Sequence, residues 1–459
     1  MKIATKEISA VSLVKEALEK AKKYETKNIF VSLNEENALK KAAEIDKKIA
    51  RGEKVGRLAG VPYALKDNFL SKEGKTTASS HILEPFQSPL DSTTVKKLEE
   101  EGAIMIGRTN MDSFAHGSST ENSYFGPTKN AKDDERVAGG SSGGSAVAVS
   151  LGIVEFATGT DTGGSIRQPA SFNGVYGFKP TYGTISRYGV VAMASSTDCI
   201  GFFTKTTEDM SLLMEICSGQ DENDLTTLPD YYVESEIREV KKIGVIKDFD
   251  NDAVAPEIRE ALKKKTEELK SKGYKIVELS MPTLKYALAV YYIIVPAEVA
   301  SNLSRYDGIR YGYRSKDAKK LDEIFAKSRN DGFMSENKRR IMIGNFVLSS
   351  GFYDAYYLKA QKARTKIIEE YDKAFKEVDF ILTPVAPNPA FKLGEKVNDP
   401  VSMYLEDVMS VPINLAGIPS LTVPVGETKE GLPLGLQLVG PRRSDKTLLS
   451  FANELKEAK

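Results

Sequence analysis

Hydrophobic and polar positions along this chain follow two patterns, one typical of helices and one typical of buried strands. Residues 6–51 place apolar side chains at helical spacing, with lysines and glutamates on the opposite face, and predict two amphipathic surface helices. Further along, short apolar runs bounded by turn residues predict strands, and longer periodic segments predict helices between them. This alternation indicates an α/β protein whose sheet is covered by helices on both faces.

The predicted elements continue to the end of the sequence. Strands are expected at residues 60–68, 103–107, 154–158, 174–180, 242–247, 274–279, 380–384 and 420–424. Helices are expected at residues 93–101, 145–151, 206–217, 256–272 and 446–457, with a long, mostly helical section at about 285–377. The polar segment 219–239 is typical of a surface connection, and we find no repeat. We therefore expect residues 1–459 to form a single domain.

Composition and charge narrow the class of protein. Of the 459 residues, 41% are hydrophobic and 28% are charged, as in an ordinary globular enzyme. Lysine plus arginine and aspartate plus glutamate both count 64. This balance argues against a chain that binds nucleic acid by itself, since such chains usually carry an excess of basic residues.

Cysteine usage and the start of the chain indicate a cytoplasmic setting. Cys199 and Cys217 form no CxxC pair, so neither a disulfide framework nor a zinc site is predicted. The first residues lack the apolar core of a signal peptide, and no uninterrupted apolar run approaches the ~18 residues that span a bilayer. We expect a cytoplasmic chain with no bound metal and no membrane partner.

Two glycine-serine turns, at residues 137–145 and 159–170, are the most informative part of the sequence. The pattern predicts a helix that begins at Ser165, directly after the second turn. A serine at that position lies beside unpaired backbone N–H groups and the positive end of the helix dipole. This geometry suits an anion, including the oxyanion that forms when a serine attacks a carbonyl.

Such a serine needs a base, and Lys66 is the better candidate. The two histidines, His81 and His116, lie in no informative motif, and we interpret each as structural or exposed. Lys66 interrupts an apolar, strand-like run, where it either reaches solvent at the strand end or is held inside. Lowering its pKa from ~10.4 to 7–8 requires about 4 kcal/mol, which burial of an amine supplies. Ser141, in the first glycine turn, is placed to relay the proton.

At this point the sequence resembles a known family, the Ser–cisSer–Lys amidohydrolases of the amidase-signature family. The resemblance rests on residues 64–68 and on two serines, Ser141 and Ser165, that are 165 − 141 = 24 residues apart and each follow Gly-Gly. It implies an α/β fold with a central mixed sheet, Ser165 as nucleophile, Ser141 as relay after a cis peptide bond, and Lys66 as general base. It also implies an oxyanion hole formed by the backbone N–H groups of Thr162, Gly163, Gly164 and Ser165.

Four further segments resemble one branch of this family, which hydrolyses glutamine inside a three-subunit, tRNA-dependent amidotransferase. They are residues 291–298, 301–308, 338–344 and 399–407. The resemblance implies that Arg340 binds the α-carboxylate of glutamine, Asp407 binds its α-ammonium, and Tyr291 lies nearby. The chemistry agrees, because a guanidinium pairs with a carboxylate through two parallel hydrogen bonds.

The same resemblance implies partners, the B and C subunits of the amidotransferase. Ammonia would pass to the B subunit, which holds the charged tRNA and uses ATP and Mg²⁺, and the small C subunit would bind this chain. No cofactor is expected in the chain itself. The expected product arises from glutamyl-tRNA(Gln), and the sequence leaves open whether aspartyl-tRNA(Asn) is also served. Ala138, His116, Cys199 and Phe202 depart from the usual residues of the family, and His116 stands where methionine is common.

Three alternatives remain. A free-standing amidase that acts on another small amide would keep Lys66, Ser141 and Ser165 without needing Arg340 and Asp407 together. A nucleotide-binding or scaffold protein would use the glycine turns for phosphate, but Ser145 follows Gly143-Gly144 where a Walker motif has lysine. A catalytically silent member of a complex is the third, and the intact set of Lys66, Ser141 and Ser165 argues against it.

Overall fold

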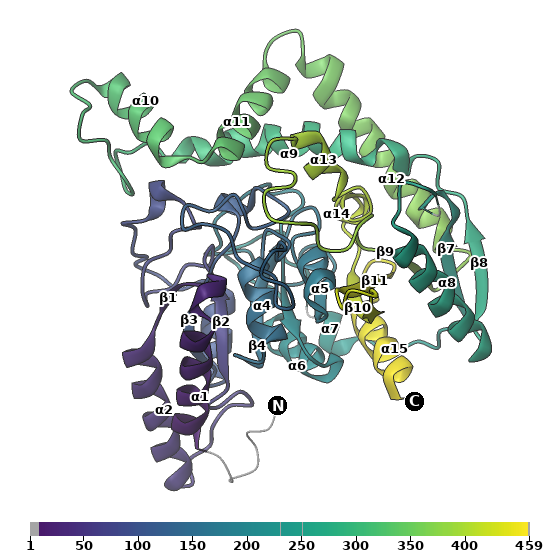
Figure 1. Ribbon diagram of the computed structural model, residues 1–459, viewed down its shortest axis with the longest axis horizontal. Helices are drawn as coiled ribbons and strands as arrows, with labels where there is room; N and C mark the ends of the chain where they lie inside the picture. The colour runs from purple at the N-terminus through teal and green to yellow at the C-terminus, as the bar shows by residue number, and fades with distance from the viewer. Residues whose placement is uncertain (1–8, 230, 250, 458–459) are drawn as a thin grey trace.

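The computed structural model describes residues 9–229, 231–249 and 251–457, and a mixed sheet runs through them (Figure 1). The strands are β1 (Phe30–Leu33), β2 (Pro62–Lys66), β3 (Ile104–Thr109), β4 (Phe156–Asp161), β5 (Tyr176–Lys179), β6 (Cys199–Thr204), β7 (Lys242–Ile246), β8 (Lys275–Leu279), β9 (Phe380–Pro384), β10 (Ser420–Glu427) and β11 (Pro433–Val439). Their order is β1-β3-β2-β4-β6-β5-β10-β11-β9-β7-β8. β2 pairs in parallel with β3 and β4, and β7 with β8 and β9, whereas the other pairs are antiparallel.

Helices pack on both faces of this sheet. They are α1 (Ala10–Lys23), α2 (Glu35–Ala50), α3 (Thr93–Glu100), α4 (Gly143–Ser150), α5 (Arg167–Asn173), α6 (Thr207–Cys217), α7 (Tyr231–Glu234), α8 (Pro256–Ser271), α9 (Ala287–Asn302), α10 (Leu321–Gly332), α11 (Ser335–Leu348), α12 (Lys359–Ala374), α13 (Pro400–Leu405), α14 (Val411–Ala416) and α15 (Asp445–Glu457). Successive side chains of β2 point to opposite faces. Tyr63 and Leu65 join a core with α3, α6, α8 and α15, and Ala64 joins another with α1, α2 and α4.

The section expected to be helical contains α9 to α12, which cross the top of the molecule in Figure 1. Within it, a continuous helical stretch over residues 284–305 has a mean hydropathy of 1.3 and is long and apolar enough, by length and composition, to cross a membrane. Our search for uninterrupted apolar runs missed it because Pro296 and Glu298 break the run. In the fold, 56% of its apolar window is buried, and Ile294 and Val299 pack in a core with α12 and α14.

Most of the predicted elements are confirmed, and the differences have physical causes. The structure adds β1, β6 and β11 to the predicted strands. Gly201 in β6, and Pro433 with Gly435 in β11, weaken the strand signal in the sequence, while neighbouring strands supply the hydrogen bonds. The helix expected to begin at Ser165 begins two residues later, at Arg167. The residues before it form a turn whose N–H groups donate to the carboxylate of Asp161.

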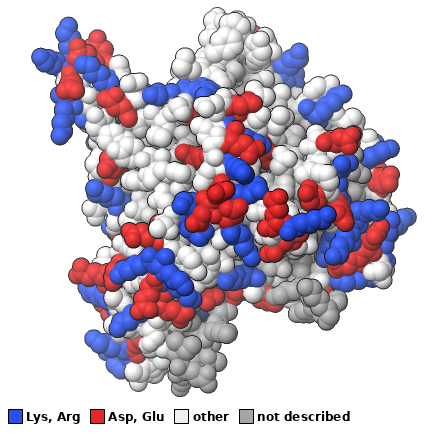
Figure 2. Space-filling model, in the orientation of Figure 1, with Lys and Arg blue, Asp and Glu red and all other residues white. Residues whose placement is uncertain are grey.

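Lysine, arginine, aspartate and glutamate are interspersed over the face of the molecule shown in Figure 2, with no broad area of one sign. This distribution agrees with the equal numbers of basic and acidic residues in the sequence. Both cysteines are free and buried, Cys199 on β6 and Cys217 at the end of α6.

Candidate active site

Lys66 ends β2 in the interior of the sheet, where its side chain is fully buried. The alternative that it reaches solvent is wrong, because β2 is not an edge strand but lies between β3 and β4, and the Lys66 side chain is completely buried. Its Nζ atom lies 2.9 Å from Ser141 Oγ, 2.7 Å from Ser142 Oγ and 2.8 Å from Thr160 Oγ1. Among the described residues, no carboxylate forms an ion pair with this amine, so three hydroxyl groups are its hydrogen-bond partners.

This environment favours the neutral form of the amine. Burial lowers the pKa of Lys66 from 10.5 to about 7, although the negative charges of Asp112, Asp161 and Asp198 oppose the shift. A neutral amine donates two hydrogen bonds and accepts one. With three hydroxyls around it, the lone pair of neutral Lys66 can therefore accept a proton from one of them.

Ser141 enters this network from a glycine turn whose backbone is tightly packed. The Gly140–Ser141 peptide bond is cis, as the resemblance implied. The Gly140 N–H donates to Gln168 Oε1 at 2.9 Å, and a Cβ at Gly140 would lie 2.1 Å from a carboxylate oxygen of Asp112. Only glycine therefore fits before Ser141, and α4 begins directly after the turn, at Gly143.

The turn that carries Ser165 is organised by Asp161, at the end of β4. Its carboxylate accepts hydrogen bonds from the N–H groups of Gly164 at 2.9 Å, Ile166 at 3.1 Å and Arg167 at 3.3 Å. The Gly164 N–H thus donates to Asp161 in this structure, and its place in the oxyanion hole stays a prediction. Thr162, Gly163 and Ser165 keep backbone N–H groups without a hydrogen bond among the described residues.

Arg167 completes the support of this turn. The Asp161–Arg167 ion pair measures 3.0 Å and is fully buried, and the guanidinium also donates to Ser410 O at 3.1 Å and Gln437 Oε1 at 2.9 Å. Burial alone would raise the pKa of Asp161, but Arg167 outweighs it and holds this pKa well below its usual range. Asp161 therefore stays ionised and keeps the turn in place.

Ser165 lies in this turn with 8% of its surface exposed. Within the described chain, no hydrogen bond joins its hydroxyl to Ser141, so that link of the predicted relay is not formed here. Tyr291, from α9, borders the same turn, because a Cβ on Gly163 would lie 2.5 Å from the Tyr291 hydroxyl oxygen. Burial raises the pKa of Tyr291, so its hydroxyl stays protonated and can act as a donor.

The expected glutamine-binding groups also lie inside the fold. Asp407 follows α13, and its carboxylate accepts hydrogen bonds from Ser118 Oγ at 2.8 Å and 2.9 Å and from the Tyr292 hydroxyl at 3.0 Å. Burial raises its pKa from 3.8 to about 7, although both hydroxyls and Arg340 oppose the shift. An ammonium group bound to this carboxylate would restore its charge.

Arg340 projects from α11 and is 3% exposed. Its Nε donates to Glu336 Oε1 at 2.8 Å, and its guanidinium lies over the rings of Tyr292 at 5.3 Å and Tyr404 at 5.8 Å. Tyr404 donates its hydroxyl to the same Glu336 oxygen at 2.8 Å. A glutamate and two aromatic faces thus fix the position of the guanidinium, while its terminal nitrogens make no hydrogen bond with the described residues.

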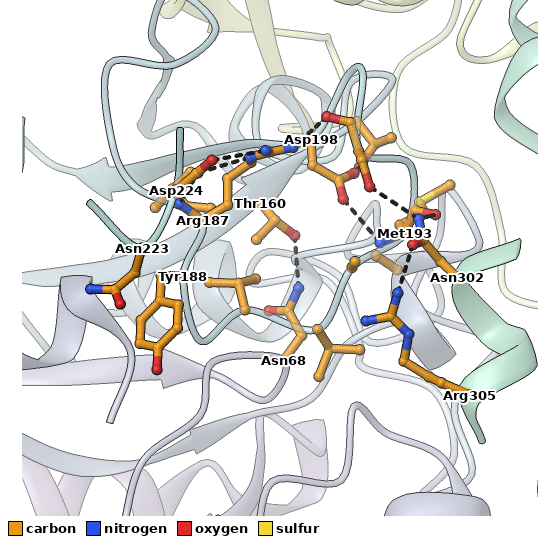
Figure 3. A pocket seen from close by; sticks show the side chains of 17 residues that line it. Asn68, Thr160, Arg187, Tyr188, Met193, Asp198, Asn223, Asp224, Asn302 and Arg305 are labelled. Carbon is orange, nitrogen blue, oxygen red and sulfur yellow. Dashed lines mark hydrogen bonds and ion pairs between the residues drawn. The ribbon is translucent and has the colours of Figure 1, made fainter. Parts of the chain in front are cut away.

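A cavity of about 220 Å³ lies next to the hydroxyl network (Figure 3). Thr160 and Asn68 line it, and Asn68 Nδ2 donates to Thr160 Oγ1 at 3.1 Å. Asp198 lines it as well, accepts a hydrogen bond from Thr162 Oγ1 at 2.7 Å, and has its pKa raised by burial to about 6. A polar space therefore adjoins the hydroxyl that contacts Lys66.

The structure thus brings together Lys66 and Ser141 in one network, and places Arg340 beside the Tyr292 that holds Asp407. The sequence reasoning missed five contributors to these two groups and to the Ser165 turn: Ser142, Thr160, Asp161, Ser118 and Glu336. Asp161 and Thr160 lie within the second glycine-serine turn, residues 159–170, so their position directly before Ser165 was a usable signal. Glu336 lies one helical turn before Arg340, the spacing of a helical ion pair.

Comparison with known proteins identifies the family of this chain. The model of the family described as amidase matches residues 12–449. The chain therefore belongs to the amidase family, and the predicted α/β fold with a mixed sheet is confirmed.

Individual relatives are similar over nearly the whole chain. The A subunit of glutamyl-tRNA(Gln) amidotransferase from Carboxydothermus hydrogenoformans is 50% identical over 463 residues, which cover 99% of this chain and 95% of that protein. The crystal structure of the corresponding A subunit from Thermotoga maritima has a TM-score of 0.80 at 39% identity and covers 98% of this chain and 92% of that one. A solved structure described as an amidase has a TM-score of 0.85 at 33% identity, covering 99% and 97%.

Proposed function

We propose that this chain is the glutamine-hydrolysing subunit of a cytoplasmic, tRNA-dependent amidotransferase that acts on glutamyl-tRNA(Gln). One observation carries the reaction class: a fully buried lysine amine lies 2.9 Å from the hydroxyl of Ser141, in a chain that belongs to the amidase family. The similarity to amidotransferase A subunits, at 50% identity, supports the choice of glutamine as substrate.

In the proposed reaction, Ser165 Oγ attacks the carboxamide carbon of glutamine. Its proton passes through the Ser141 hydroxyl to the neutral amine of Lys66, and the oxyanion accepts hydrogen bonds from the N–H groups of Thr162, Gly163 and Ser165. Each such donor is typically worth a factor of ~10²–10³ in rate. Protonated Lys66 then returns a proton through Ser141 to the leaving nitrogen, and ammonia departs. Water hydrolyses the glutamyl ester of Ser165 and releases glutamate.

Glutamine would be held as a zwitterion. Arg340 would pair with its α-carboxylate and Asp407 with its α-ammonium, which leaves the side-chain amide directed toward Ser165. Tyr291, whose hydroxyl borders the Ser165 turn, would contact the ligand between these two ends. A buried carboxylate whose pKa is about 7 without ligand suits this role, because binding a cation favours its ionised form.

The complex would supply what the chain lacks. We propose that the B subunit of the amidotransferase receives the ammonia, holds the charged tRNA and uses ATP and Mg²⁺, that the C subunit binds this chain, and that the chain itself carries no cofactor or metal. The neutral charge balance supports leaving most of the tRNA contact to the partner. The sheet that runs through the described residues supports treating residues 1–459 as one domain.

Co-expression with the B and C subunits, followed by measurement of glutamate release, tests the proposal. We expect wild type to hydrolyse glutamine at least a hundredfold faster than acetamide, and Ser165→Ala to abolish release. Turnover of acetamide equal to that of glutamine would instead establish a free-standing amidase, an alternative supported by the similarity to a solved amidase. Binding of ATP by the isolated chain would contradict the proposal.

A further inference from the structure

His116 carries a nitrogen atom that lacks a partner within the part of the chain that the structure describes. The residue follows a turn of 3-10 helix, η4 (Ser113–Ala115), and its side chain is fully buried. The Nε2 atom is buried and makes no hydrogen bond. An unpaired polar atom in the interior costs about 1–3 kcal/mol, so its position calls for a specific partner.

The hydrogen-bond network identifies this nitrogen as a donor. Asn337 on α11 accepts hydrogen bonds through Oδ1 from Ser113 Oγ at 2.9 Å and from the Met334 N–H at 3.1 Å. Its Nδ2 group donates to Ser113 O at 2.8 Å and lies 2.7 Å from His116 Nδ1. Because both Asn337 ends are fixed in this way, His116 Nδ1 must accept. The proton of the neutral ring is therefore on Nε2.

The same helix face carries Arg340, one turn after Asn337. Burial and the positive charge of Arg340 lower the pKa of His116 well below 6.5, so the ring is neutral. The neutral N–H and the free terminal nitrogens of the guanidinium are thus donors in the same region. An anionic ligand with two acceptor atoms, such as a carboxylate, matches this pair of donors.

We propose that His116 Nε2–H donates a hydrogen bond to the α-carboxylate of glutamine beside Arg340, an inference that rests on the proposed function. The loop that contains His116 also contains Ser118, which holds Asp407, and Ser118 O accepts a hydrogen bond from Gln168 Nε2 at 2.9 Å. One short loop therefore carries both His116, which contacts the helix of Arg340 through Asn337, and Ser118, which contacts Asp407. Methionine at position 116 would offer no N–H, so this chain recognises the carboxylate with one more directional bond.

Substrate analogues separate the two ends of glutamine. Glutaramate keeps the carboxylate and lacks the ammonium, whereas 4-aminobutanamide keeps the ammonium and lacks the carboxylate. We expect His116→Met to raise KM about 10- to 100-fold for glutamine and for glutaramate, because a hydrogen bond to a charged group is worth about 1.5–3 kcal/mol. We expect kcat to change little and KM for 4-aminobutanamide to stay within about twofold. His81→Met, at the other histidine, is the matched control and should leave all three KM values unchanged.

A second measurement does not depend on how His116→Met folds. In ¹⁵N-histidine-labelled protein with Ser165→Ala, the chain gives signals from two imidazoles only. We expect the His116 Nε2–H proton to move downfield when glutamine or glutaramate saturates the protein, and to stay in place with 4-aminobutanamide.

Two outcomes of the NMR measurement would overturn the inference while leaving the proposed function intact: an unchanged Nε2–H signal at saturating glutamine, or a proton on Nδ1 instead of Nε2. An equal rise of KM for all three amides would also overturn it, since it would indicate a merely structural role. If the wild-type complex neither binds nor hydrolyses glutamine, the proposed function fails, and this inference fails with it.

Discussion

Two buried basic side chains, Lys66 and Arg340, have opposite surroundings. Lys66 contacts three neutral hydroxyls, and burial lowers its pKa to about 7. Arg340 contacts the carboxylate of Glu336 and lies over two tyrosine rings, and its pKa is raised well above the usual value of an arginine. The comparison teaches that burial without a carboxylate partner makes a base, whereas burial with one preserves a charge for recognition.

The two regions also differ in how the chain builds them. The network of Lys66 consists of β2, the turn at Ser141 and the end of β4, all within the sheet and its adjoining turns. The region of Arg340 combines α9, α11 and the segment after α13, whose contacts span more than 100 residues of sequence, as between Tyr292 and Asp407. The following predictions test this division between a base and a recognition charge.

Loss of the amine should have the largest effect. We expect Lys66→Met to reduce kcat for glutamine by about 10⁴-fold or more, because the proton of Ser165 then has no acceptor. Lys179→Met is the matched control, since Lys179 is also fully buried but its Nζ donates to Pro180 O at 3.0 Å, away from the serines. Steady-state glutamate release measures both variants. Equal losses in the two would mean that burial of a lysine, rather than its place beside Ser141, is what matters.

Removing one member of the buried ion pair behind Ser165 should strongly destabilise the fold. We expect Asp161→Ala to lower the free energy of unfolding by about 3–5 kcal/mol, because Arg167 is left charged and unpaired in the interior. Urea denaturation followed by circular dichroism measures this change. The double variant Asp161→Asn with Arg167→Met should recover part of the loss, and no recovery would show that the hydrogen bonds of the turn outweigh the ion pair.

Arg340 should act on substrate binding and not on the chemical step. We expect Arg340→Met to raise KM for glutamine and glutaramate by about 30- to 1,000-fold, corresponding to about 2–4 kcal/mol for a buried charged contact. Arg339→Met is the matched control, because Arg339 also pairs with Glu336 but its side chain is 41% exposed. A loss confined to kcat would contradict the assigned role.

The smallest expected effect is a difference in pH dependence between two substrates, which separates the role of the base from that of the recognition charge. Lys66, with a pKa lowered to about 7, is neutral above that pH and protonated below it, so activity should fall as the pH drops. Asp407, with a pKa raised to about 7, loses its charge over the same range. Glutamine needs both groups deprotonated, so we expect its kcat/KM to fall by up to about 100-fold per pH unit below 6. Glutaramate lacks the ammonium group and needs only neutral Lys66, so its kcat/KM should fall by about tenfold per pH unit. Identical pH dependences for the two substrates would show that Asp407 does not bind the ammonium group.

Some parts of the fold and the site could be predicted from the sequence, and others could not. The strand that ends in Lys66, the cis bond before Ser141 and the helical section were anticipated, because local apolar runs and a specific motif signal them. The hydrogen bond from the Gly164 N–H to Asp161 was not anticipated, because only the folded turn shows it. β6 and β11 were missed, because the pairing of strands distant in sequence compensates for the glycines and the proline within them.

The sequence by itself determined the family, the alternation of strands and helices, and the residue types available for an amide-cleaving site, since these depend on local pattern and motif spacing. Only the tertiary structure decided the states of the charged groups. The pKa of Lys66 depends on complete burial among Ser141, Ser142 and Thr160, which lie 75 to 94 residues away from it in the chain. The free N–H of His116 depends on an asparagine 221 residues away. Burial and long-range contact set these properties, and no local pattern encodes them.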